Sequence, residues 1–149
     1  MKAGGEDSSW FVEAKNIDFG DGTKVTASGD GASVSIQADN RLSFGLNDQF
    51  KTPNSGGISL YSFQSITATG LKVIGGDIDI ESFPPEDGHI PGREITLTNS
   101  LINQTSVDGS LTMLAGDTFE PKDSDKITLV HTRVITRGFA DIEPDPAVS

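Results

Sequence analysis

Short segments in which hydrophobic and polar residues alternate recur along the chain, and each begins just after a glycine. They cover residues 32–38, 57–62, 77–82 and 110–115. A period of two residues is typical of a β-strand that buries one of its faces. We therefore expect one inward-facing column made of Val34, Ile36, Ile58, Leu60, Ile78, Ile80, Leu111 and Met113.

Two further kinds of segment follow each of these strands in a fixed order. The first places a small polar residue between two hydrophobic ones, at 42–44, 66–68, 95–97 and 127–129, with an earlier copy at 17–19. The second lies two or three residues later, at 24–27, 71–74, 101–103 and 133–136. Three short strands per repeat with a corner between each pair predict an all-β, parallel β-helix, or solenoid.

The repeats divide the chain into about five coils with three strands each. The expected coils cover residues 10–29, 30–56, 57–75, 76–109 and 110–138, and residues 139–142 open a sixth. Their lengths differ, and the proline-containing segments 50–57, 83–92 and 117–125 are expected to absorb the difference as loops. An antiparallel β-sandwich or jelly roll is the alternative. The same strand pair recurring in the same order favours the solenoid.

Three phrases carry these repeats most clearly: GGDIDIES, REITLTNSLINQTSVDGSLTMLAGD and DKITLVHTRVIT. They resemble the repeats of filamentous-haemagglutinin-type exoproteins, which are bacterial surface adhesins exported by two-partner secretion. The resemblance is best over residues 56–136, and the motifs of the family's secretion domain are missing. It implies a right-handed parallel β-helix that is secreted or exposed on a bacterial cell surface. It also implies that a host-surface glycan or protein is the partner.

Composition and charge narrow the classes of partner. The 149 residues include 17 glycines, 7 prolines and no cysteine, which excludes disulfides and thiolate metal sites. The formal net charge of −11 disfavours nucleic acid, and no apolar run is long enough to insert into a membrane. We expect a single solenoid domain over residues 10–142. Residues 1–9 are expected to be a disordered leader or expression scar and 143–149 a linker or tail, so that the chain is part of a longer protein.

The strand at 77–82 contains the most suggestive group of polar residues. Asp77, Asp79 and Glu81 alternate along it, so their carboxylates are expected on one outer face, about 6.5–7 Å apart. Such a group is a candidate calcium site, and Ca²⁺ is the one cofactor that the sequence suggests. It is also a candidate acid–base pair for glycoside hydrolysis, although strand surfaces carry solvated carboxylates without any such role.

A ligand site is expected around the same group. Tyr61 is predicted to point outward beside Asp79, where an exposed aromatic ring suits contact with a carbohydrate. Asp87 and His89, on the adjoining long loop, are the further candidates for ligand binding. No nucleotide-binding loop, nucleophile elbow or histidine metal motif occurs, so no residue is expected to be catalytic.

Two features of the second and third strands complete the picture. An outward ladder of Asp18, Ser43, Thr67, Thr96 and Thr128 would present the flat threonine array of an ice-binding solenoid, which is a third, weaker alternative. Asn40 and Asn99 are expected at corners, where asparagine tolerates the left-handed backbone conformation. The sequence thus predicts an adhesin or stalk segment, with a polysaccharide-active β-helix hydrolase or lyase as the main alternative.

Overall fold

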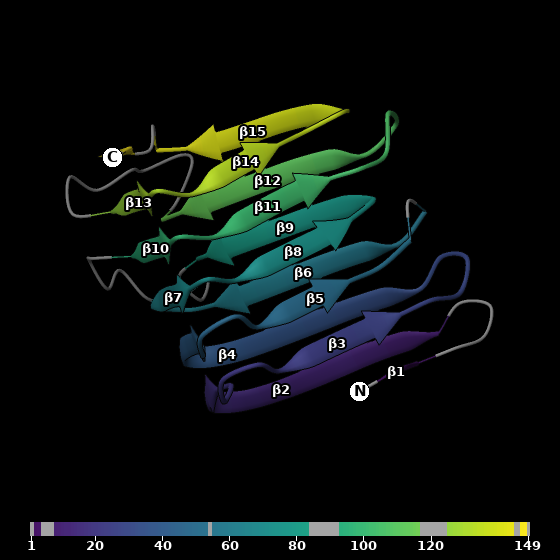
Figure 1. Cartoon of the computed structure of the whole chain (residues 1–149). Coiled ribbons are helices and arrows are strands. Elements are labelled where there is room, and N and C mark those ends of the chain that lie inside the picture. Colours follow the sequence, from purple (N-terminus) through teal and green to yellow (C-terminus); the bar gives the residue numbers. More distant parts are fainter. Residues whose placement is uncertain are drawn as a thin grey trace.

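The chain is an all-β solenoid in which every strand pair is parallel. The computed structural model describes residues 2–3, 8–53, 55–83, 93–116, 125–144 and 147–148, and this part of the chain contains no helix. Its strands stack in successive layers, with the N-terminus at one end of the stack and the C-terminus at the other (Figure 1). The parallel β-helix is therefore confirmed, and the antiparallel sandwich is excluded for the described strands.

The strands form three columns that run along the solenoid. The first column contains the first half of β2 (Ser9–Asp18), the first half of β4 (Ser33–Phe44), β6 (Gly57–Ser62), β9 (Asp77–Ser82), β12 (Ser110–Ala115) and β15 (Phe139–Glu143). The second contains the second halves of β2 and β4, then β7 (Ser65–Thr69), β10 (Glu94–Thr98), β13 (Lys126–Val130) and β16 (Ala147–Val148). The third contains β1 (Lys2–Ala3), β3 (Lys24–Ala27), β5 (Gln49–Lys51), β8 (Lys72–Gly75), β11 (Leu101–Gln104) and β14 (Arg133–Ile135).

The order of three strands per coil agrees with the sequence, but two details differ. In the first two coils β2 and β4 pass through the corner between the first and second columns without a break, apart from a register shift between Ala14 and Asn16. The strand β5 was missed, because the loop expected from residue 50 in fact begins after it. The backbone of 2–3 pairs with β3, and that of 147–148 pairs with β13.

The interior of the solenoid is apolar throughout. All of the residues expected in the inward column are at most 1% exposed: Val34, Ile36, Ile58, Leu60, Ile78, Ile80, Leu111 and Met113. Phe50 of β5 is fully buried, and its ring packs edge-on against Phe19 and Phe44 with centroids 5.3 and 5.2 Å away. This aromatic contact explains why so short a segment is held as a strand.

Two of the three corners have strict backbone requirements. Between the third and first columns, a Cβ atom on Gly109 would collide with the carbonyl oxygen of Gly76 in the preceding coil, so only glycine fits. Between the second and third columns, Gly70, Asn99 and His131 occupy equivalent places in successive coils and all have positive φ, of 72°, 48° and 46°. The corner predicted at Asn99 is confirmed. Asn40 also lies at a corner, the one between the first and second columns, but there β4 is continuous and Asn40 has no positive φ.

The corner between the first and second columns has no fixed length. The chain crosses it inside a strand in β2 and β4, with two residues between β6 and β7, and with residues 83–93 and 116–125 in the next two coils. Where the chain does turn, Ser62 and Ser82 occupy equivalent buried positions just before the corner. Their hydroxyls donate to the carbonyl oxygens of Asn40 (2.6 Å) and Gln64 (2.7 Å) in the preceding coil. The strands before and after the two longest connections, 83–93 and 116–125, therefore remain stacked on the strands of the neighbouring coils.

Candidate functional site

The outer face of β9 carries the three carboxylates that the sequence singled out. Asp77, Asp79 and Glu81 alternate with the buried Ile78 and Ile80, which confirms that all three point outward. The registers place Asp79 between Ser59 and Thr112, and Glu81 between Tyr61 and Leu114. Their partners on the neighbouring strands are thus uncharged, and the carboxylates lie in a line along one strand.

Partial burial changes the acidity of two of these groups. Burial raises the pKa of Asp79; a hydrogen bond with the Thr112 side chain opposes the rise, and the charge of Asp77 adds to it. Burial, and then the charge of Asp79, raise the pKa of Glu81. Asp77 instead accepts a hydrogen bond from the Ser110 backbone N–H at 2.8 Å. Asp79 and Glu81 therefore hold a proton more readily than fully solvated carboxyl groups do.

Tyr61 lies on this face, but its neighbour differs from the one expected. Its register partner on β9 is Glu81, whereas Ser59 is the partner of Asp79, because the pairing of β6 with β9 fixes which side chains are adjacent. The Tyr61 ring is half-buried and packs edge-on against Phe63, with centroids 5.6 Å apart. Burial and the charge of Glu81 raise the pKa of the phenol. The aromatic–carboxylate pair on this face is therefore Tyr61 with Glu81.

Arg93 is a charged residue near Tyr61 that sequence reasoning missed. The residue is 1% exposed, and its Nη1 donates to the Phe63 carbonyl oxygen, whereas Nε and Nη2 are buried without a hydrogen bond to any described group. Its backbone N–H donates to Asp125 Oδ1 at 2.9 Å. Burial lowers the pKa of Arg93, and the charges of Asp125 and Tyr61 oppose this. Nothing in the sequence distinguishes it from an ordinary surface arginine after a proline-rich loop.

The remaining candidates for metal and ligand binding are not tested by this geometry. Asp87 and His89 lie outside the described residues. Within the described ranges, no group of three or more His, Cys, Asp or Glu side chains is arranged to hold a metal ion. Calcium binding by Asp77, Asp79 and Glu81 therefore stays a prediction.

The outward ladder of the second column is in register, as expected. Asp18, Ser43, Thr67, Thr96 and Thr128 are successive partners across five strands. Ice binding by this ladder remains a prediction.

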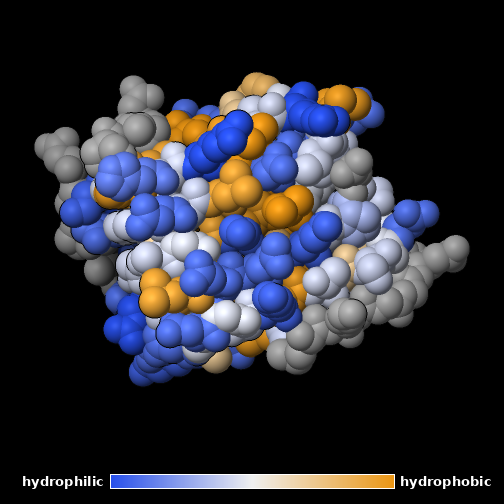
Figure 2. Space-filling view, viewed as in Figure 1, coloured by the Kyte–Doolittle hydropathy of each residue, from blue (hydrophilic) through white to orange (hydrophobic). Residues whose placement is uncertain are grey.

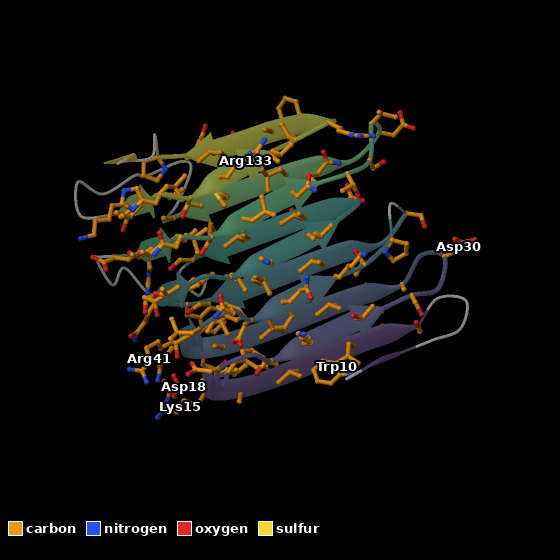
Figure 3. The ribbon with its side chains drawn as sticks, viewed as in Figure 1. Trp10, Lys15, Asp18, Asp30, Arg41 and Arg133 are labelled. Carbon is orange, nitrogen blue, oxygen red and sulfur yellow. The ribbon has the colours of Figure 1, made fainter. Side chains whose placement is uncertain are left out.

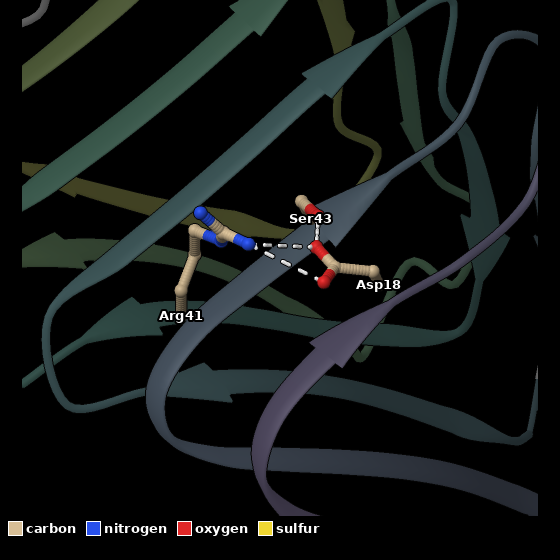
Figure 4. Close-up of polar contacts among 3 residues, drawn as sticks. All are labelled: Asp18, Arg41 and Ser43. Carbon is tan, nitrogen blue, oxygen red and sulfur yellow. Dashed lines mark hydrogen bonds and ion pairs between the residues drawn. The ribbon is translucent and has the colours of Figure 1, made fainter.

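The ladder begins in a compact polar contact (Figure 4). Ser43 Oγ donates to Asp18 Oδ1, and Arg41 Nη2 lies 3.3 Å from both carboxylate oxygens of Asp18. The hydrogen bond from Ser43 is the largest cause of a lowered pKa at Asp18; partial burial opposes it, and the Arg41 charge adds to it. In a later coil Lys126 Nζ pairs with Glu94 Oε1 at 2.8 Å, so charges on this column are neutralised locally.

Comparisons with models of protein families, with curated proteins and with solved structures give no match for this chain. Among the described residues, no helix has the length and apolar character needed to cross a membrane. Function must therefore be argued from the surfaces of the solenoid.

Proposed function

We propose that this chain is a segment of a bacterial secreted or cell-surface β-helix protein that acts as an adhesin or stalk. The observation that carries the proposal is the set of outward ladders, which continue from coil to coil on all three columns in exact strand register. Such surfaces present a repeating array of side chains to an extended partner. The resemblance of three repeat phrases to haemagglutinin-type exoproteins supports the same reading.

The arrangement of the carboxylates favours binding over catalysis. Glycoside hydrolysis places an acid and a base on either side of the bond that is cleaved. Asp79 and Glu81 instead follow one another along a single strand, with Ser59, Thr112, Tyr61 and Leu114 as their neighbours across the strands. We therefore assign Tyr61 and Glu81 to a shallow glycan contact.

A glycan array with the purified chain tests this proposal. Tyr61→Ala is expected to weaken binding to the glycans that the chain recognises by at least about tenfold, because the ring supplies the apolar contact surface. Gln37→Ala is the matched control, since Gln37 is the register partner of Tyr61 on β4 and is also partly buried. Equal binding by both variants, or no glycan binding at all by the chain, would contradict the proposed contact.

A polysaccharide hydrolase or lyase is the second candidate, and the raised pKa values of Asp79 and Glu81 favour it, because a general acid must stay protonated. Incubation with a panel of acidic polysaccharides distinguishes the two functions. We expect no release of reducing ends or of unsaturated products. Turnover that disappears in Asp79→Asn or Glu81→Gln would replace the adhesin assignment by an enzymatic one.

A further inference from the structure

The outer face of the third column is basic, although the protein as a whole is strongly acidic. Its strands β3, β5, β8 and β14 contribute Lys24, Lys51, Lys72 and Arg133, all exposed, and none of the described outward residues of this column is Asp or Glu. The four cations are far apart in the sequence and come together only through the stacking of the coils. We call this surface the basic face.

The outer face of the first column carries the opposite charge. It presents six carboxylates and, among the residues that the structure describes in its strands, no lysine or arginine. These carboxylates belong to Glu13, Asp77, Asp79, Glu81, Asp141 and Glu143. We call it the acidic face. The second column lies apart from this division, because its two salt bridges pair Arg41 with Asp18 and Lys126 with Glu94.

One pair of charges on each face has the same spacing along the solenoid. On the basic face, Lys72 and Arg133 are both register partners of Leu101, so one uncharged strand separates them. On the acidic face, Asp79 and Asp141 are both partners of Thr112. Two strand separations amount to about 9.6 Å in each case. The pairs Lys72–Arg133 and Asp79–Asp141 are therefore equally spaced, because one backbone stack sets both distances.

Three of the cationic side chains on the basic face are unpaired among the described residues, and a partly exposed leucine lies between two of the cations. In the part of the chain that the structure describes, the side chains of Lys51, Lys72 and Arg133 make no hydrogen bond or ion pair. Leu101 lies partly exposed between Lys72 and Arg133, and Leu114 lies in the same way between Glu81 and Glu143 on the acidic face. Contact between the faces would bury apolar side chains between the ion pairs.

From this complementarity we propose that the chain associates side by side with a second copy, the basic face of one copy against the acidic face of the other. The proposal does not rest on glycan binding by Tyr61, but Tyr61 and Glu81 lie on the acidic face, so association and glycan binding would compete for that face. Each exposed ion pair contributes at most about 1 kcal/mol, so several must act together and the association is weak and salt-sensitive. The contact is heterologous, since the two faces differ, and each copy keeps one face free for a further copy.

Sedimentation velocity over a range of protein concentrations tests the association. At about 0.1 M salt, repulsion between the net charges is screened beyond about 10 Å while ion pairs in contact persist, so the wild-type sedimentation coefficient should rise with concentration. At about 1 M salt the chain should sediment as a monomer. A wild-type chain that stays monomeric at both salt concentrations would overturn the proposal.

Complementation between variants identifies the faces. The variant Lys72→Glu with Arg133→Glu loses the basic face, and Asp79→Lys with Asp141→Lys loses the acidic face. Each alone should associate at least about tenfold more weakly than the wild type, because one partner surface is missing. An equimolar mixture should associate again, since the intact acidic face of the first variant meets the intact basic face of the second.

The matched control reverses the same amount of charge elsewhere. Lys15→Glu with Lys126→Glu changes two exposed cations outside the basic face, and Lys15 lies beside Asp18 and Arg41, at the far end of the molecule from Arg133 (Figure 3). This variant should associate like the wild type. Circular dichroism and urea midpoints establish whether each variant folds. If the basic-face variant does not fold, the double variant Lys51→Gln and Lys72→Gln is a milder replacement.

Two outcomes would assign the faces differently. If the mixture of variants stays monomeric while the wild type associates, the two faces do not contact each other and the proposal fails. If the wild type stays monomeric but binds dextran sulfate through Lys72 and Arg133, the basic face is a surface for a polyanion and not for a second copy.

Discussion

At the scale of single residues, the surroundings of a side chain on the solenoid follow from its register partners and not from its neighbours in sequence. Asp79 and Glu81 alternate along one strand with buried isoleucines, yet Asp79 is adjacent to Thr112 and Glu81 to Tyr61. Asp79 is partly buried in a position that disfavours its charge. Its protonation should therefore contribute to stability.

We predict that Asp79→Asn makes the chain more stable to urea at pH 7 than the wild type. Because burial raises the pKa of Asp79 in the folded chain, the protonated carboxyl stabilises the fold below the ordinary aspartate pKa of about 4. That contribution is lost as the pH rises through the raised pKa. Asparagine removes the charge and keeps an oxygen for Thr112.

Urea titrations between pH 3 and pH 7 measure this effect. The two chains should have the same unfolding midpoint at the lowest pH, and their midpoints should separate as the pH rises. Asp141→Asn, on the exposed end strand β15, is the control for removing one negative charge. If Asp79→Asn is less stable than the wild type at pH 7, the carboxylate of Asp79 is stabilising and the prediction is wrong.

Residues of the core were predictable and the pairing of surface residues was not. The alternation of Ile78 and Ile80 with Asp79 shows which side chains are buried, since that depends on one strand alone. The contact of Tyr61 with Glu81 depends on the offset between two strands, which loops of unequal length conceal. The burial of Arg93 against the Phe63 carbonyl and the positive φ of His131 likewise have no signal in the sequence.

At the scale of strands, a buried glutamine connects successive coils of the third column. Gln104 ends β11 and is fully buried; its Nε2 donates to the carbonyl oxygens of Gly76 and Ser106, both at 2.6 Å. Its Oε1 accepts from Thr136 Oγ1 at 3.0 Å and from the backbone N–H groups of Arg137 and Gly138 at 2.9 Å. The side chain thus satisfies backbone groups of three coils at one corner.

Gln104→Met is expected to lower the free energy of unfolding by roughly 2–4 kcal/mol, because it leaves the buried Gly76 carbonyl and the part-buried backbone groups of Ser106, Arg137 and Gly138 without partners at nearly constant volume. Chemical denaturation monitored by circular dichroism gives the value. Asn103→Leu on the same strand points outward and should change it by no more than about 0.5 kcal/mol. Equal effects of the two substitutions would mean that the hydrogen bonds of Gln104 are dispensable.

The strands themselves were largely predictable, since hydrophobic alternation marks most of them. Among the strands that were not predicted, β5 is too short for its alternation to be distinguished from a loop, and its Phe50 is recognisable as a core residue only once Phe19 and Phe44 are seen beside it. The continuity of β2 and β4 was likewise hidden, because polar residues between two strands look the same whether the chain turns or runs straight.

At the scale of the whole molecule, the described strands pair with strands of the preceding and following coils, while charge is sorted between the columns. The visible side in Figure 2 shows hydrophobic residues gathered in the middle with hydrophilic residues around them, so the surface is not uniformly polar. Composition predicts the net charge but not its division into a basic and an acidic face, because that division requires the coil boundaries to within one residue.

Amide hydrogen exchange should be graded along the solenoid. Strands in the middle of the stack, such as β6 and β9, have a partner on both sides, whereas β15 has a described partner on one side only. Since local opening costs least at an end, amides of β15 should exchange at least about tenfold faster than those of β6. Exchange at one uniform rate, measured by NMR, would indicate that the solenoid opens only as a single unit.

The corner between the first and second columns has a consequence for the engineering and evolution of such chains. Its variable length means that this corner imposes no turn geometry of its own, unlike the glycine and left-handed corners. Peptides can therefore be grafted between Phe63 and Gln64, the two residues that now connect β6 to β7. The carbonyl oxygens of these two residues must be kept, because they accept from Arg93 and Ser82, while the hydroxyl of Ser62 continues to hold the preceding coil. New binding specificities could be displayed there, one above another, on a scaffold that does not change.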